Sequence, residues 1–217
     1  MQGCLKPWRN FRRKSDNSEK NARPSGGPNV TSVVKLETEW PEILGVMILP
    51  GVLLFPGSLV PLYIFEQRYR KMLAQALAAQ RIFGIVSSSE ADGGPPKIAG
   101  AGLIRACVGN DDGTSHLILL GISRIHIREW VADGEYPAVK ATIQDSHLSA
   151  PDDAEHWQGE IKRLCRSLAK KGRAMPPHFE DAASMAAGPV ELSDLVASTL
   201  VEDSLVRERL FYELDAS

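Results

Sequence analysis

The 217-residue chain has little cysteine, few aromatic residues and no long apolar run. Its three cysteines, Cys4, Cys107 and Cys165, show neither the spacing of a zinc site nor the even number of a disulfide framework, so we expect the reducing cytoplasm. Prolines interrupt the longest apolar stretch before it reaches the roughly 18 residues of a membrane-spanning helix. The first twenty residues combine basic side chains with no apolar stretch. We therefore expect no secretory signal and no membrane partner.

Charge is distributed unevenly along the chain. The formal net charge is −2, but residues 1–30 hold seven basic and two acidic side chains, which leaves −7 for the remainder. Residues 1–38 are also rich in Ser, Asn, Pro and Gly and poor in apolar side chains, a composition typical of disorder. We predict a disordered basic tail over 1–38. Such a tail either has no partner or binds nucleic acid and other anionic surfaces.

From Trp40 onward, short apolar segments alternate with turn residues. EILGVMIL, LVPLYIF, RIFGIVSS, KIAGAGLIRACVG and YPAVKATI each have the composition of a strand. TSHLILLGISRIHIREW is predicted to form two strands that meet near Gly121, with Arg124, His126 and Arg128 on a wet face. NDDG and ADGE are typical of hairpin turns, and SEADGGPP of an exposed loop.

One amphipathic helix is predicted within this strand-rich region. Apolar side chains recur at helical spacing at Tyr69, Met72, Leu73, Ala76 and Leu77. Six or seven short strands with a single helix among them favour a mostly antiparallel, curled sheet or barrel over 39–148. The predicted fold class is therefore α+β.

The last third of the chain changes to helical patterns. PDDAEHWQGEIKRLCRSLAKKG begins with acidic residues, ends with basic residues and is followed by Gly172, a typical helix stop. Its buried face is predicted to consist of Trp157, Ile161, Leu164, Cys165 and Leu168. MPPHFEDAAS is expected to form a loop, and PVELSDLVASTL and DSLVRERLFYELD two further helices. Residues 149–217 are thus predicted to form a helical subdomain.

The motifs of common catalytic classes are absent from the sequence. Neither GxGxxG nor GxxxxGK followed by Ser or Thr occurs, so no run of backbone amides is arranged to hold phosphates. The sequence has no GxSxG elbow, and its histidines lack the HExxH spacing of a zinc site. Asp111 and Asp112 precede a glycine, which favours a hairpin turn over an acid/base pair. We expect no catalytic residue, no cofactor and no metal, and no group of residues supports the alternative of an unrecognised hydrolase.

Several strings together resemble a known family. ILPGVLLFPGSLVPLYIFEQRYRKML, AGAGLIRACVGNDDG, LILLGISRIHI and the closing LSDLVASTL and LFYELD are similar to the N-terminal, substrate-binding domain of Lon proteases, especially its free-standing bacterial versions. The resemblance extends from about Ile43 to Leu214. Its most specific part is the order of residues in LFPG and PLYIFEQRYR.

The resemblance implies a PUA-like β-barrel that carries one helix and is followed by a helical subdomain. In full-length Lon this domain precedes an ATPase module and a serine-lysine peptidase, and it helps to capture unfolded or tagged proteins. Both later modules are missing from these 217 residues, so we expect a non-catalytic polypeptide-binding module. Its expected partners are unfolded or exposed polypeptide segments, together with a separate protease. The sequence indicates no oligomeric state.

Residues that match the family's motif are expected either to be structural or to contact the peptide. They are Phe55, Pro56, Pro61, Phe65, Glu66, Arg68, Tyr69 and Arg124. The prolines are expected to fix turns and strand edges. Glu66 is expected to pair with Arg105 or Arg124 from a neighbouring strand. The apolar candidates for peptide contact, for which burial in the core is the preferred interpretation, are Leu53, Leu54, Phe55 and Phe65.

RNA binding is the alternative function, since PUA-like folds include RNA modules. The basic tail and the side chains of Arg105, Arg124 and Arg128 are the candidates for contact with phosphates. The charge of −7 outside the tail argues against this alternative.

Overall fold

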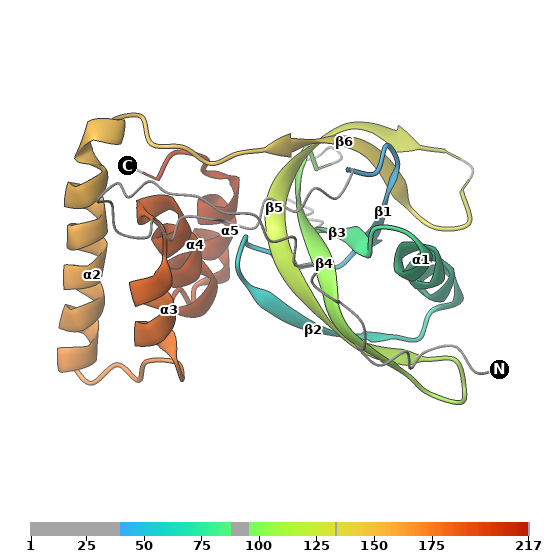
Figure 1. Ribbon diagram of the computed structural model, residues 1–217, viewed down its shortest axis with the longest axis horizontal. Helices are drawn as coiled ribbons and strands as arrows, with labels where there is room; N and C mark the ends of the chain where they lie inside the picture. The colour runs from blue at the N-terminus through green and yellow to red at the C-terminus, as the bar shows by residue number, and fades with distance from the viewer. Residues whose placement is uncertain (1–39, 88–95, 133, 217) are drawn as a thin grey trace, which may run out of the picture. The chain divides into compact units, whose positions relative to one another are not determined.

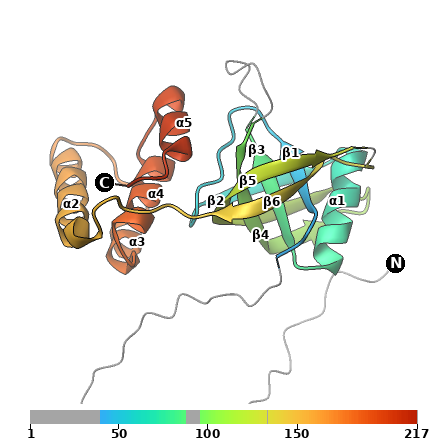
Figure 2. The same ribbon diagram turned by 90° about the horizontal axis from the view of Figure 1, so that it is seen from above.

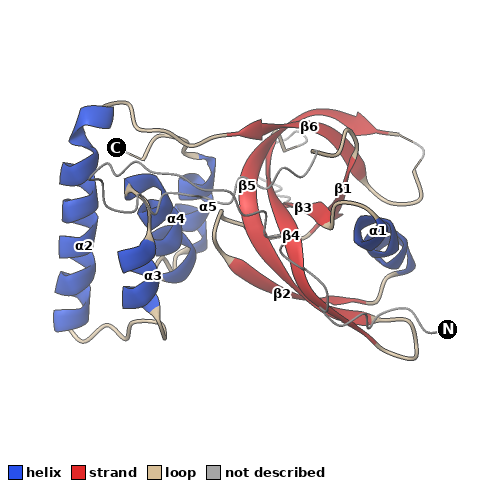
Figure 3. Ribbon diagram, viewed as in Figure 1, coloured by secondary structure: helices blue, strands red, loops and turns tan. Residues whose placement is uncertain are grey.

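The computed structural model describes residues 40–87, 96–132 and 134–216. These described residues belong to one compact unit (Figures 1 and 3). Its elements, in chain order, are β1 (Leu44–Ile48), β2 (Leu59–Ile64), α1 (Gln67–Ala78), β3 (Ile82–Val86), β4 (Ile98–Gly109), β5 (Ser115–Val131), β6 (Ala138–Gln144), the short 3-10 helix η2 (Pro151–Asp153), α2 (Ala154–Lys170), α3 (Phe179–Met185), α4 (Pro189–Thr199) and α5 (Ser204–Tyr212). The predicted tail 1–38 and nearly all of the predicted loop SEADGGPP lie outside the described residues.

The six strands form one mixed sheet in the order β2-β5-β4-β3-β1-β6, and β6 also pairs with β5. Five of the pairings are antiparallel and one, between β1 and β3, is parallel. The mostly antiparallel prediction is confirmed. Within the described part of the chain, β2 pairs only with β5, so the sheet has an open end strand and is not a barrel in which every strand has two neighbours. Membership of the PUA-like class stays a prediction.

Strand β5 is continuous from Ser115 to Val131, and the prediction of two strands that meet near Gly121 is therefore wrong. The glycine has another purpose, because a β-carbon at Gly121 would overlap the carbonyl oxygen of Phe55. The Gly57 amide donates to the Gly121 carbonyl, and the Gly121 amide donates to the Ser58 carbonyl, both at 2.8 Å. Gly121 thus lets the loop before β2 lie directly on the strand.

Helix α1 confirms its predicted face, since Tyr69, Met72, Leu73 and Ala76 are buried while Leu77 is half-buried. The buried side chains pack with residues of the sheet such as Phe83. Burial of each large apolar side chain contributes about 1.5–3 kcal/mol to stability. Seen in Figures 1 and 2, α1 covers one side of the sheet and the C-terminal helices lie on the other.

The C-terminal region differs from its prediction in two places. The segment predicted as a loop contains α3, because Phe179 packs with Cys165 and Leu200 in a small cluster. On α2, Leu164 and Leu168 are 49% and 40% exposed, so their predicted burial is wrong. Of the predicted apolar face, Cys165 is buried and Trp157 and Ile161 are half-buried.

The predicted boundary between residues 148 and 149 falls between β6 and η2. This division into two domains stays a prediction. None of the helices in the described ranges combines the length and apolar character of a membrane span.

Candidate functional site

The loop between β1 and β2 carries the Pro-Gly breaks of the family motif. Phe55 is buried and Pro56 half-buried, and Gly57 has a φ of +78°, a left-handed conformation that glycine adopts without strain. The Ser58 hydroxyl donates to the Phe55 carbonyl at 2.6 Å. Together with the bonds to Gly121, this bond makes the loop a fixed turn.

Phe55 connects this turn to the C-terminal helices. Its ring meets that of Phe211 edge-on at a centroid distance of 5.1 Å, and both pack with Ala197. The guanidinium carbon of Arg124 lies 5.4 Å from the Phe55 ring centroid and 5.3 Å from that of Phe211. Phe55 is therefore a structural anchor between the sheet and α4 and α5, rather than a surface contact.

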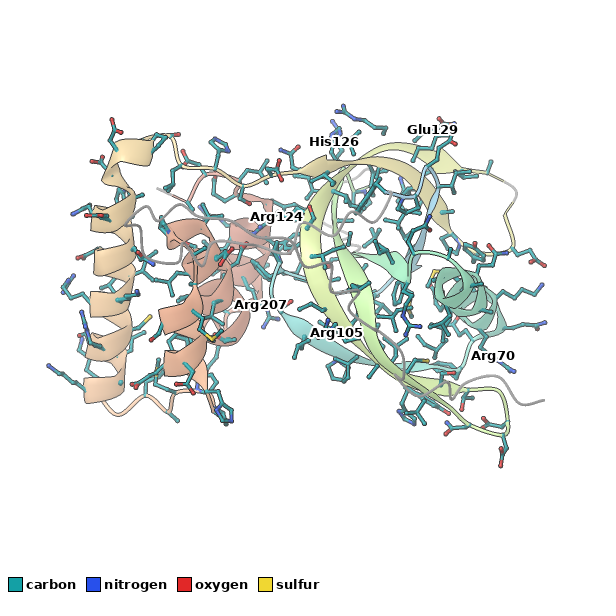
Figure 4. All side chains as sticks on the ribbon, in the orientation of Figure 1. Arg70, Arg105, Arg124, His126, Glu129 and Arg207 are labelled. Atoms are coloured by element: carbon teal, nitrogen blue, oxygen red, sulfur yellow. The ribbon has the colours of Figure 1, made fainter. Side chains whose placement is uncertain are left out.

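Arg124 is 2% exposed, and each of its nitrogens donates to a protein oxygen. Two nitrogens donate to the Asp194 carboxylate at 2.6 and 3.0 Å, one of them also to the Ser146 hydroxyl at 3.0 Å, and Nε donates to the Phe211 carbonyl at 2.8 Å. Figure 4 shows Arg124 extending from β5 toward the helices. The wet-face prediction for Arg124 is wrong, because α4 and α5 cover the strand at this position, near its middle. Sequence reasoning missed Asp194, which the sequence does not distinguish from Glu191, the other carboxylate of α4.

The motif residues that begin α1 serve local structure. Glu66 pairs with Arg68, whose Nε and Nη2 donate to one carboxylate oxygen at 2.8 and 2.6 Å, and this bond raises the pKa of Arg68. The predicted pairing of Glu66 with a strand arginine is therefore wrong. Arg124 has Asp194 as its partner, and Arg68 lies only two residues from Glu66. Tyr69 is buried, and its hydroxyl accepts a hydrogen bond from the Ile48 amide at 3.3 Å.

Strand β2 and the residue after it expose one entire apolar side. Leu59, Tyr63 and Phe65 are 62%, 48% and 59% exposed, and Pro61 between them is exposed as well, while Ile64 is buried. The four residues alternate along the chain and so share one side of the strand, which we name the β2 outer face. Core burial, the preferred interpretation for Phe65, is wrong. Because almost every residue of LVPLYIF is apolar, its pattern could not distinguish the inner side from the outer one.

The aromatic rings of the β2 outer face are ordered. The Tyr63 ring stacks on that of Phe65 at 5.7 Å and on that of His116, in β5, at 4.6 Å. No sequence pattern connects His116 with Tyr63, since only the strand register places the two side by side.

The β2 outer face continues across the neighbouring strands. Its cross-strand partners on β5 are Leu120 beside Leu59, Ile118 beside Pro61 and His116 beside Tyr63. On β4, Ala106 pairs with Ile118, and Val108, which is 65% exposed, pairs with His116. A hollow of about 420 Å³ lies here, and no carboxylate, ammonium or guanidinium is among its described lining residues. The result is a largely apolar surface three strands wide.

A second hollow, of about 310 Å³, lies beside the Arg124–Asp194 pair, with Ile161, Leu210 and Glu213 among its lining residues. Since every nitrogen of Arg124 already has a protein acceptor, this hollow offers no free cation to a ligand.

The described residues hold no group of three or more His, Cys, Asp or Glu side chains that could bind a metal ion. The Asp112 carboxylate accepts hydrogen bonds from the amide and hydroxyl of Thr114 at 2.9 and 2.7 Å, which lowers the pKa of Asp112. Asp112 thus closes the turn between β4 and β5, as predicted. Burial raises the pKa of the Cys165 thiol, the opposite of what an activated nucleophile needs.

The three strand arginines proposed for phosphate contact do not share one exposed surface. Arg124 is buried in its ion pair, whereas Arg105 and Arg128 are exposed. Arg128 donates to the Thr142 hydroxyl at 3.3 Å. The basic tail lies outside the described residues.

Fold and site together define an α+β domain with a mixed sheet, a helical C-terminal region and an exposed apolar sheet surface. Residues 43–217 match the family model of the ATP-dependent protease La (LON) substrate-binding domain. Because the match covers most of the chain, the protein belongs to this family.

Individual relatives agree with this family. The chain is 25% identical over 183 residues to Lon protease of Desulfosudis oleivorans, covering 81% of this chain and 22% of that protein. Lon protease of Methylocella silvestris is 26% identical over 191 residues, covering 82% of this chain and 23% of that protein. The chain thus spans between a fifth and a quarter of the length of these curated relatives.

Solved structures share the fold. The N-terminal domain of Mycobacterium avium complex Lon protease has a TM-score of 0.62 at 17% identity, covering 80% of this chain and 91% of that one. The Lon N-terminal domain protein from Xanthomonas campestris has a TM-score of 0.55 at 18% identity, covering 80% of this chain and 92% of that one.

Proposed function

We propose that this protein is a non-catalytic module that binds exposed apolar segments of other polypeptides. The observation that carries the proposal is the β2 outer face, which exposes large apolar side chains together with a hollow whose described lining has no carboxylate, ammonium or guanidinium. Exposed apolar patches of this kind mark binding surfaces in soluble proteins. The family supports the same function, since its model describes the substrate-binding domain of a protease.

The proposal includes the partners and the wider fold. A polypeptide held by this module would be passed to a separate protease, which the family supports because its model describes the substrate-binding domain of a protease. The curled sheet with one covering helix supports a PUA-like arrangement.

The test is the fluorescence anisotropy of a labelled, permanently unfolded polypeptide titrated with the full chain. Replacing the two ordered rings, Tyr63→Ser with Phe65→Ser, should weaken binding at least about tenfold, which corresponds to about 1.4 kcal/mol. Ile143→Ser is the matched control, because Ile143 is 51% exposed on β6, away from the β2 outer face. Equal binding by the double variant and the control would contradict the proposed surface.

Labelled single-stranded RNA, titrated in the same way, tests the alternative function. Glutamine in place of Arg12, Arg13 and Lys14 should weaken any RNA binding and flatten its salt dependence, because fewer counterions are released. The same variant should bind unfolded polypeptide as the natural chain does. RNA binding that persists at physiological salt, without polypeptide binding, would replace the proposed function.

A further inference from the structure

We infer that the captured segment docks on the β2 outer face through its side chains and does not add a strand to the open edge of β2. The occupant assigned to this surface is an uncharged polypeptide stretch rich in aromatic and aliphatic residues. This inference rests on the proposed function and specifies how the same site works.

The open edge of β2 is a poor template for strand addition because of Pro61. Strand β2 has six residues, and β5 pairs with it on one side. A proline is tolerated in a sheet where its missing N–H faces away from the neighbouring strand. Pro61 therefore leaves the open edge without a donor near its middle, and natural sheets use edge prolines in this way to prevent pairing.

The β2 outer face, unlike the edge of β2, offers apolar side-chain surface to which a polypeptide segment can bind. The Tyr63 ring stacks on both Phe65 and His116, so three rings form an ordered platform. Beside the platform, the hollow of about 420 Å³ between Pro61 and Val108 provides space for apolar side chains. Aromatic platforms of this kind bind through the surface of the side chains and require no backbone pairing.

The described lining of this hollow contains no carboxylate, ammonium or guanidinium, and its one imidazole, that of His116, is stacked on Tyr63. A charged side chain placed there would lose water without gaining an opposite charge, which is strongly unfavourable. An apolar side chain loses no such hydration and buries apolar area on both partners. Segments with carboxylates or ammonium groups spaced along them should therefore be rejected.

A second copy of the chain fits this surface less well than a foreign segment. Two copies commonly associate by pairing their edge strands, but each β2 edge would bring its own Pro61, so both sides would lack a donor. The remaining arrangement of two copies, face against face, is an outcome that the test below detects.

The experiment uses the full chain and a labelled peptide of alternating Phe, Leu and Ser residues. A second peptide has the same side chains with every other backbone nitrogen methylated, which removes the donors that strand addition needs. Side-chain docking predicts that the two dissociation constants differ by less than about threefold, and that Tyr63→Ser weakens both by about tenfold. A third peptide, with Asp in place of each Leu, should not bind.

The outcomes separate the inference from the proposed function. If methylation weakens binding more than about tenfold while the unmodified peptide binds, strand addition is the mode and the inference is wrong, but the proposed function stands. Loss of binding by every peptide, including the unmodified one, would overturn both. Sedimentation velocity of the free protein completes the test, since a dimer that dissociates in Tyr63→Ser would assign the surface to a second copy instead.

Discussion

Phe55 and Phe65 lie ten residues apart in the same motif and have opposite fates. Phe55 is 1% exposed and packs against Phe211, whereas Phe65 is 59% exposed and stacks on Tyr63. The first fixes the sheet to the helices, and the second belongs to the proposed binding surface. The comparison teaches that a family motif can combine a structural anchor with a functional surface, and that only burial separates the two.

The two regions also differ in polarity. The junction around Phe55 contains a buried ion pair, Arg124 with Asp194, while the hollow of the β2 outer face has no carboxylate, ammonium or guanidinium among its described lining residues. Substitutions at the junction should therefore change stability, and substitutions on the outer face should change binding alone.

The largest expected effect is that of Asp194→Ala. It leaves the buried Arg124 guanidinium without its carboxylate and should lower the free energy of unfolding by roughly 3–5 kcal/mol, measured by urea denaturation. The control is the double variant Arg124→Met with Asp194→Leu, which removes both charges and should recover a large part of this loss. A single variant as stable as the natural chain would contradict the importance of the pair.

The two phenylalanines provide the second test. Phe55→Ala should cost roughly 3–5 kcal/mol, because it opens a cavity between the sheet and α4 and α5. Phe65→Ala should change stability by less than about 0.5 kcal/mol while weakening polypeptide binding. Thermal unfolding followed by circular dichroism measures the stability of both variants. Similar melting temperatures for the two would contradict the different burial of Phe55 and Phe65.

Substitution of two glycines by alanine should change the free energy of unfolding by a smaller amount. Gly121→Ala should destabilise by roughly 1–3 kcal/mol, since the new methyl group overlaps the Phe55 carbonyl and pushes the loop off β5. Gly159→Ala is the control, because open space surrounds Gly159 within helix α2, and it should stabilise by about 0.5–1 kcal/mol. Chemical denaturation should therefore give changes of opposite sign, and two changes of the same sign would contradict the close approach.

The smallest expected effect is on the pH dependence of stability. The hydrogen bonds from Thr114 hold the pKa of Asp112 below its ordinary value of 3.8. A carboxyl whose pKa is depressed by folding adds stability that is present above the ordinary value and is lost as the pH falls through the folded value. Thr114→Val should raise the pKa of Asp112 and weaken this acid-side dependence, as NMR titration would show. An unchanged pKa in the variant would rule out the hydroxyl as the cause.

Local patterns were sufficient for much of the fold. The spacing of Tyr69, Met72 and Leu73 predicted α1 and its buried face, and Gly113 behind two aspartates predicted the turn between β4 and β5. These features depend on interactions within a few residues, which a sequence displays directly.

The site was less accessible to sequence reasoning. Tyr63 and Leu59 were not among the expected contacts, because an apolar strand gives the same pattern whichever side is buried. The partner of Arg124 was also missed, since Asp194 lies 70 residues away and meets it only when α4 packs on the sheet.

By itself, the sequence determined the α+β class, the order of most strands and helices, and the similarity to the Lon substrate-binding domain. The tertiary structure alone decided which side of β2 remains exposed, which carboxylate neutralises Arg124 and why Gly121 must be a glycine. The physical reason is that hydrogen-bonding turns and helical periodicity are short-range properties of the chain. Burial, in contrast, depends on which distant segments pack together, and it is burial that separates Phe55 from Phe65.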